Sequence, residues 1–315
     1  MFYSSESDLK SNQSAINHFY ENTLVKSYLT TPCGKLFYAY AKPNNAQAAI
    51  VISSGRVEGL EKYKELLWEL YNNNYAVFII DHQGQGRSYR HLKNKHKGYV
   101  KSFNNYIFDL KKFNLQVVDI HWQGKKILLG HSMGAAIAFN YLASIEHNFN
   151  GGFLSAPMFD IHTPNIPRLI IKLITNTARL FGFQYSYAFG QKNYLPIEFS
   201  KNTLTSSKIR YALFKQAYQQ EPTLQLGGVT YGWLYAAFRF MSSIKQLSVS
   251  IPLYIASAKN DKVVDNNAQY QIANSHSNIT LESFANADHE LLFERDEIRK
   301  PVLKSFYTFC EKINY

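Results

Sequence analysis

Residues 130–134 read GHSMG, which has the pattern G-x-S-x-G around Ser132. The segment 126–129 before it is strand-like, and 135–143 (AAIAFNYLA) has the composition of a helix. In a strand-to-helix turn of this kind, the glycines permit a sharp bend that exposes the serine hydroxyl in a strained conformation. The sequence therefore predicts a nucleophilic serine at position 132.

A serine hydroxyl is a weak nucleophile at its ordinary pKa, so it needs a base and a group that orients the base. With this turn, the acid and then the histidine follow the serine along the chain. Asp261 and His289 fit, because each comes shortly after a late apolar run, at 251–256 and at 279–284. We therefore expect Asp261 to orient His289, and His289 to act as the base.

Three neighbouring residues compete for these roles. Asp265 lies close to Asp261, but its place before a helical segment favours helix capping. Asp288 adjoins the histidine and is badly placed to reach its Nδ1 atom. His131 precedes the serine on the strand and is expected to pack or hydrogen-bond there.

Acyl transfer also needs two backbone N–H groups aimed at the oxyanion that forms in the transition state. One is expected from Met133, directly after the serine. The other is expected from Arg56, in the segment 53–59 (SSGRVEG), where Gly55 permits a turn. The Arg56 side chain has two interpretations: it meets an anionic group of the substrate, or it is exposed or structurally paired.

The segment 81–88 (DHQGQGRS) is rich in glycine and follows an apolar run. It lacks the G-K-[ST] ending of a phosphate-binding loop and the pattern G-x-G-x-x-G. We interpret it as a tight structural loop beside the active site.

These residues need a scaffold whose strands end at a common edge. Apolar runs at 48–53, 75–81, 126–130 and 152–156 alternate with helical segments, and the alternation resumes with 251–256 and 279–284. Continuous apolar strands between helices indicate a mostly parallel sheet with helices on both faces. The sequence predicts an α/β core formed by 1–156 and 249–315, with 157–248 inserted as a helical cap.

The chain has 315 residues, of which 46% are hydrophobic and 18% charged, as in an ordinary globular protein. The polar first ten residues lack the pattern of a secretion signal, and no run approaches the roughly 18 apolar residues of a membrane span. Cys33 and Cys310 have no metal-binding spacing, and we interpret them as free thiols. We expect a cytoplasmic protein.

The formal net charge of +11 favours anionic partners. The segment 157–248 contains ten Lys or Arg and three Asp or Glu. Within it, residues 167–183 alternate apolar and basic side chains. This pattern is typical of a helix that lies on an anionic membrane. It also fits a cap helix that packs its apolar face on the core and turns its basic face to water. A second basic stretch, 87–101, is interpreted as a solvated loop, with guidance of lipid phosphate as a weaker option. No nucleic-acid module is visible, so no nucleic-acid partner is expected.

Seven segments together resemble a known family: GHSMG, SSGRVEG, DHQGQGRS, APMF at 156–159, GGVTYGW at 227–233, AKNDKVVDN at 258–266 and DHELLFE at 288–294. They are similar to the bacterial inner-membrane lysophospholipases, within the wider monoacylglycerol lipase and serine-aminopeptidase-like group of α/β-hydrolases. The resemblance covers nearly the whole chain. It implies the α/β-hydrolase fold and cleavage of the acyl ester of a lysophospholipid, without metal or cofactor.

The resemblance supports the triad and oxyanion donors named above: Ser132, Asp261, His289, Arg56 and Met133. It implies a lysophospholipid or monoacylglycerol substrate. Together with the basic cap, it implies an anionic membrane surface as partner, at the inner face of the cytoplasmic membrane. We expect the apolar part of the cap to hold the acyl chain, with Tyr231 and Trp233 as lining residues.

One departure concerns the oxyanion segment. Related monoacylglycerol lipases usually carry His-Gly where this chain has Ser54-Gly55. The backbone role survives this change, but it weakens the case for transferring their substrate preference to this chain. A monoacylglycerol lipase, carboxylesterase or aminopeptidase with the same triad stays an alternative, while an intact triad argues against a non-enzymatic lipid binder.

Overall fold

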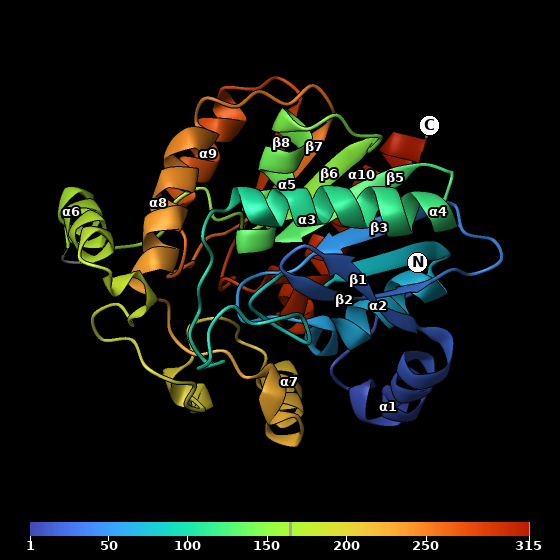
Figure 1. Ribbon diagram of the computed structural model, residues 1–315. Coiled ribbons are helices and arrows are strands. Elements are labelled where there is room, and N and C mark those ends of the chain that lie inside the picture. Colours follow the sequence, from blue (N-terminus) through green and yellow to red (C-terminus); the bar gives the residue numbers. More distant parts are fainter. Residues whose placement is uncertain (164–165, 315) are drawn as a thin grey trace.

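An eight-stranded sheet forms the centre of the protein (Figure 1). The computed structural model describes residues 1–163 and 166–314. The strand order is β1-β2-β4-β3-β5-β6-β7-β8, with bounds β1 Val25–Thr31, β2 Gly34–Ala41, β3 Ala48–Ser53, β4 Tyr75–Ile80, β5 Lys126–His131, β6 Gly151–Ser155, β7 Leu253–Ala258 and β8 Ile279–Phe284. β2 is antiparallel to its neighbours β1 and β4, and all other neighbouring strands run parallel.

Helices cover both faces of this sheet, because alternate side chains of the buried strands point to opposite sides. In β3, Ala49 and Val51 join one core cluster, while Ile50 and Ile52 join the other. The first cluster includes residues of α3 (Asn104–Phe113), α5 (Met133–Ser144), α8 (Tyr231–Ile244) and α9 (Asn266–Asn274); the second includes residues of α2 (Lys64–Asn72) and α10 (Asp296–Asn314). The predicted α/β-hydrolase architecture is confirmed.

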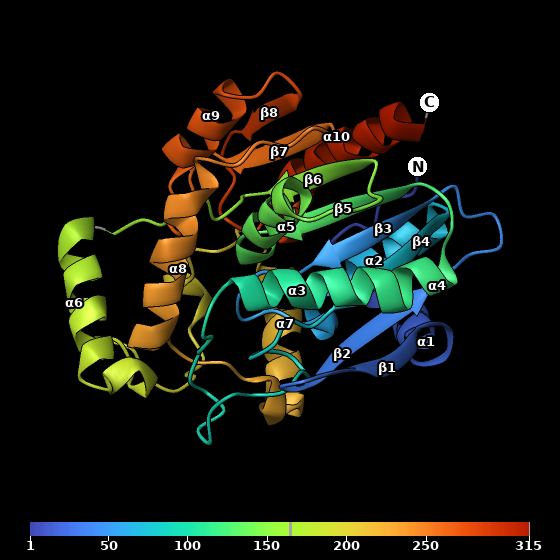
Figure 2. The same ribbon diagram turned by 45° about the horizontal axis from the view of Figure 1, so that its top comes forward.

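The segment between β6 and β7 adds no strand to the sheet within its described residues. We call residues 157–248 the insertion. It holds α6 (Arg168–Leu180), α7 (Lys208–Gln220) and α8. Figure 2 shows α8, and α6 outside it, beyond the carboxyl ends of the parallel strands. Within the described ranges, no helix is both long and apolar enough to cross a membrane.

Helix α6 turns its apolar side chains to solvent. Leu173 and Leu180 are 66% and 84% exposed. The basic side chains instead approach α8, where Lys172 donates to a serine hydroxyl and Arg179 to the hydroxyl of Tyr235. The interpretation with the apolar face on the core is therefore wrong for these leucines, whereas Lys172 and Arg179 are exposed to water as it expected. The interpretation as a helix on an anionic membrane stays a prediction.

The basic stretch 87–101 is a loop in which Lys93, Lys95 and Lys101 are exposed, as predicted, but other residues of it contact the insertion. Arg87 forms ion pairs with Glu61 and, in the insertion, Glu221. Gly98 pairs with Val229 in an isolated bridge. This stretch therefore packs along the insertion, because its arginines find carboxylate and carbonyl partners there.

Candidate active site

Ser132 occupies the turn between β5 and α5 with φ +51° and ψ −118°. A non-glycine residue in this region is strained. The flanking glycines are needed for close packing rather than for their own dihedral angles. A Cβ on Gly134 would lie 2.1 Å from the carbonyl oxygen of Ser53, and one on Gly130 would lie 2.4 Å from the Cα of Ala135. The strain therefore sits on the serine itself.

His289 lies between Ser132 and Asp261. Its Nε2 is 2.8 Å from the Ser132 Oγ, and its Nδ1 is 2.6 Å from the Asp261 Oδ2. All three residues are buried, with Ser132 8% exposed. With the ring proton on Nδ1, the histidine donates to Asp261 and can accept the serine proton, which is the geometry that activates a serine.

Asp261 is held in its ionised form. Burial by itself would raise its pKa, but the hydrogen bond and charge of His289, together with two backbone N–H groups, outweigh burial and lower the pKa below its usual value. Those N–H groups belong to Val263 and Val264, at 2.8 and 3.0 Å from Oδ1. The carboxylate therefore stays charged and fixed in place.

The competing residues lie elsewhere. Asp265 caps α9 by accepting the N–H of Asn267. Asp288 forms no hydrogen bond with His289 in the described part of the chain. The His131 ring packs 5.0 Å from that of His289, and burial lowers the pKa of His131 to about 4, so it is neutral at pH 7.

The loop after β3 brings Arg56 to the edge where Ser132 lies. The side chain of Glu58 accepts the N–H of Gly55 at 2.6 Å, and the Gln85 amide donates to the carbonyl of Gly55 at 2.7 Å. Within the described residues, the N–H groups of Arg56 and Met133 form no hydrogen bond. Both are thus unoccupied donors, as an oxyanion hole requires.

The loop 81–88 forms hydrogen bonds with the oxyanion segment 53–59. Besides the Gln85 contacts, His82 Nε2 lies 2.9 Å from the Ser53 hydroxyl. Its two glycines have positive φ, +81° at Gly84 and +53° at Gly86. The loop therefore supports the oxyanion segment, in line with the structural interpretation of its sequence.

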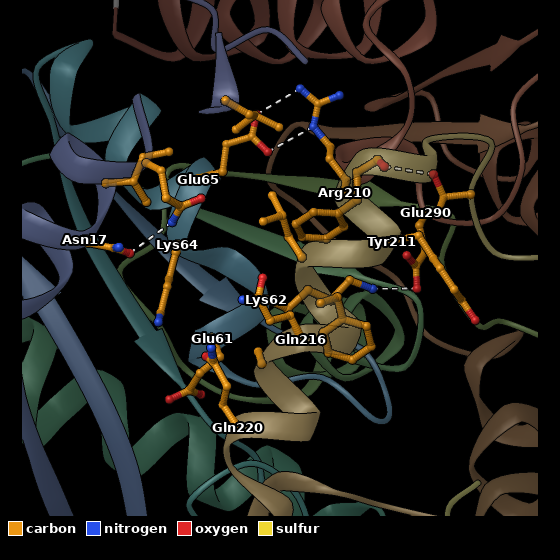
Figure 3. A pocket seen from close by; sticks show the side chains of 18 of the residues that line it. Asn17, Glu61, Lys62, Lys64, Glu65, Arg210, Tyr211, Gln216, Gln220 and Glu290 are labelled. Atoms are coloured by element: carbon orange, nitrogen blue, oxygen red, sulfur yellow. Dashed lines mark hydrogen bonds and ion pairs between the residues drawn. The ribbon is translucent and has the colours of Figure 1, made fainter. Parts of the chain in front are cut away.

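Lys62 joins the loop of Arg56 to the loop of His289 through buried ion pairs that the sequence motifs did not reveal. Its ammonium lies 2.7 Å from Glu58 and 2.5 Å from Glu290, the residue after His289, and its side chain is 3% exposed. Figure 3 shows Lys62 reaching the Glu290 carboxylate at the wall of a cavity among α1 (Leu9–His18), α2 and α7. Despite burial, the ammonium and His131 lower the pKa of Glu58 to about 2.

The two predicted lining residues differ in environment. Trp233 is 5% exposed and packs on Phe103 in the core, with the Arg56 guanidinium over its ring at 5.5 Å from the centroid. Tyr231 is partly buried at the start of α8. A lining role for either stays a prediction.

The fold, the strained serine turn and the aligned histidine and aspartate define the class of protein as an α/β-hydrolase with a serine nucleophile geometry. Residues 44–296 match the family described as serine aminopeptidase, S33, and the chain belongs to this family of hydrolases.

Similar proteins include a probable lysophospholipase L2 of Haemophilus influenzae, 32% identical over 87% of this chain and 88% of the relative. The lysophospholipase L2 of Escherichia coli K12 is 33% identical over 84% of this chain and 81% of the relative. Among solved structures, a soluble variant of the monoglyceride lipase of Saccharomyces cerevisiae has a TM-score of 0.74 at 17% identity, covering 93% of this chain and 97% of that one.

The ion pairs of Lys62 lead to a prediction about pH. In Lys62→Met, Glu58 and Glu290 face each other in a buried site without a cation, so at least one of the two has a pKa above its unfolded value. The folded variant then binds a proton that the unfolded chain releases, and its stability falls as the pH rises above about 4.5. We expect a loss of about 3–5 kcal/mol at pH 8, and a smaller loss at pH 5, from urea unfolding.

The control is Lys300→Met, which removes the same charge from an exposed position on α10. It should change stability by about 0.5 kcal/mol or less at both pH values. Equal losses for Lys62→Met at pH 5 and pH 8 would contradict this account of the pair.

Proposed function

We propose that this protein hydrolyses the acyl ester of lysophospholipids through Ser132, His289 and Asp261. The observation that carries the proposal is the hydrogen-bonded line from Asp261 through His289 to Ser132, in which the serine lies in a strained turn. The names of the two lysophospholipase L2 relatives support the choice of substrate.

The reaction follows from this geometry. His289 accepts the Ser132 proton as Oγ attacks the ester carbonyl, and the N–H groups of Arg56 and Met133 bind the oxyanion of the tetrahedral intermediate. When the intermediate collapses, His289 returns the proton to the departing glycerophosphodiester alkoxide. Water, deprotonated by the same histidine, then attacks the acyl-enzyme; His289 returns this proton to the Ser132 Oγ as the bond to the acyl carbon breaks, and the fatty acid is released.

The insertion is proposed as the cap of a core formed by residues 1–156 and 249–315, and as the part that docks on an anionic membrane at the inner face of the cytoplasmic membrane. The support is the exposed apolar side of α6, with Leu169 79% and Leu173 66% exposed, together with the excess of basic residues in this segment. Apolar side chains flanked by basic ones favour an anionic lipid surface.

A monoacylglycerol lipase is the second candidate. A rat monoglyceride lipase is 24% identical over 87% of this chain, and the yeast monoglyceride lipase has the same fold. The same triad and oxyanion donors would serve this ester, whose leaving group is glycerol instead of a glycerophosphodiester.

Ser132→Ala tests the reaction. It removes the nucleophile, so kcat for a lysophospholipid should fall to near background, by a factor on the order of 10⁶. Asp261→Asn keeps the shape but disfavours the required histidine tautomer and should lower kcat by about 10⁴-fold. Fatty-acid release is measured for a lysophospholipid, a monoacylglycerol and a short aryl ester of matched purity.

Asp265→Asn is the matched control, because this carboxylate caps α9 close to Asp261 without touching the histidine. It should keep kcat within about threefold, because the asparagine side-chain oxygen caps a helix about as well as aspartate does. Undiminished lysophospholipid hydrolysis by Ser132→Ala would refute the proposal, and wild-type protein that cleaves only the monoacylglycerol would favour the second candidate.

The membrane proposal is tested by Leu173→Asp combined with Leu180→Asp. Because these exposed leucines would enter the lipid, the double variant should bind vesicles of anionic phospholipid at least about tenfold more weakly. Leu115→Asp with Ile120→Asp is the control, since it alters two exposed apolar residues of the core, 52% and 67% exposed. Equal vesicle binding by the two double variants would exclude α6 as the docking element.

A further inference from the structure

Arg56 carries a mostly buried charge that no carboxylate of the described chain neutralises. Its Nη2 donates to the carbonyl of Gly227 in the insertion, and its guanidinium lies over the Trp233 ring. Its Nε is buried and has no hydrogen-bond partner. Burial lowers the pKa of Arg56 to about 10, and the charges that oppose this effect come from tyrosines.

The most deeply buried cations of the described chain are paired with carboxylates, while Arg90 has no carboxylate and its guanidinium donates to four backbone carbonyls, against one for Arg56. Lys62 meets Glu58 and Glu290. Arg210 contacts three carboxylates and Arg299 two, and their side chains are 3% and 1% exposed. A buried charge without its partner costs several kcal/mol, so an unpaired guanidinium in the same protein indicates an anion supplied from outside.

The missing side chain of Gly98 gives the Arg56 guanidinium space beside the oxyanion loop. A Cβ on Gly98 would lie 2.8 Å from the Arg56 Nη2, so only glycine at position 98 permits the present placement. The backbone N–H of the same arginine is the proposed oxyanion donor. The guanidinium therefore lies within one arginine side chain's length of an ester carbonyl bound at that N–H.

A lysophospholipid carries such a group, because its glycerol bears both the acyl ester and a phosphodiester. A guanidinium binds phosphate oxygens through two parallel N–H donors, and the Arg56 Nε is a donor without a partner. A monoacylglycerol has a neutral hydroxyl at the corresponding position, which leaves the charge unpaired.

We propose that the Arg56 side chain binds the phosphate of the lysophospholipid headgroup and thereby selects this substrate over a monoacylglycerol. The inference rests on the proposed function, and it assigns to one residue two separate roles: a backbone donor for every ester, and a side-chain donor for phosphate alone.

The test compares kcat/KM for a lysophosphatidylglycerol and a monoacylglycerol of the same acyl chain, both below their aggregation limits. In Arg56→Met, the ratio of the two values should fall about 100-fold, because truncating one partner of a desolvated charge pair costs 2–5 kcal/mol or more. Arg56→Lys keeps the charge but loses the planar pair of donors, and its ratio should fall by about tenfold. The lysine variant also covers the case in which the methionine variant fails to fold.

Arg90→Met is the matched control. Arg90 also reaches from the core to carbonyls of the insertion, those of Thr223 and Leu224. If arginines at this boundary only hold the insertion in place, Arg56 and Arg90 variants should both leave the substrate ratio unchanged, and that result would overturn the inference. A ratio that falls in the Arg56 variants alone supports it.

The same measurements distinguish a failure of the headgroup role of Arg56 from a failure of the proposed function. Wild-type protein that cleaves both substrates, with Arg56 variants that lose both activities in parallel, overturns the headgroup role but leaves the hydrolase intact. Wild-type protein that cleaves neither substrate overturns the proposed function and the inference together.

Discussion

The active site depends on how closely the first turn of α5 approaches the end of β3. Gly134 lies against the carbonyl of Ser53, and the Ser53 hydroxyl in turn donates to the carbonyl of Gly134. No side chain fits between them. This approach sets the bend at Ser132 and also the start of the loop that carries Arg56, so the same contact positions the proposed nucleophile and the proposed oxyanion donors.

Buried ion pairs connect the loop of Arg56 to the loop of His289. Lys62 connects Glu58, in the loop of Arg56, to Glu290, the residue after His289. Two loops from distant parts of the chain are thus held together, although no backbone hydrogen bond of the described residues joins them. Electrostatic stabilisation of a transition state requires donors that are fixed before the substrate arrives, and a buried, fully paired network supplies that rigidity.

Local signals in the sequence predict much of this arrangement. The apolar strands, the G-x-S-x-G turn, and the loops of Asp261 and His289 follow from patterns within short segments. The ion pair of Lys62 with Glu290 could not be predicted, because it joins residues far apart in sequence and depends on how two loops meet. Glu58 and Lys62 do have the i, i+4 spacing of a helical ion pair, but that spacing is common on exposed helices.

The orientation of α6 shows a different limit. Its sequence predicts an amphipathic helix, and amphipathicity does not say which face points inward. Arg179 and Lys172 contact α8, while Leu173 and Leu180 remain in solvent. The same limit applies to Arg56, whose sequence position indicates the oxyanion loop but not the absence of a counter-charge around its guanidinium.

The central claim is that Ser132 is the activated nucleophile. It is tested most directly by treating the folded protein with a fluorophosphonate and locating the adduct by mass spectrometry. We expect one covalent adduct on the peptide that contains Ser132, no adduct in Ser132→Ala, and much slower labelling in His289→Ala. An adduct on another residue, or undiminished labelling of Ser132→Ala, would contradict the assignment.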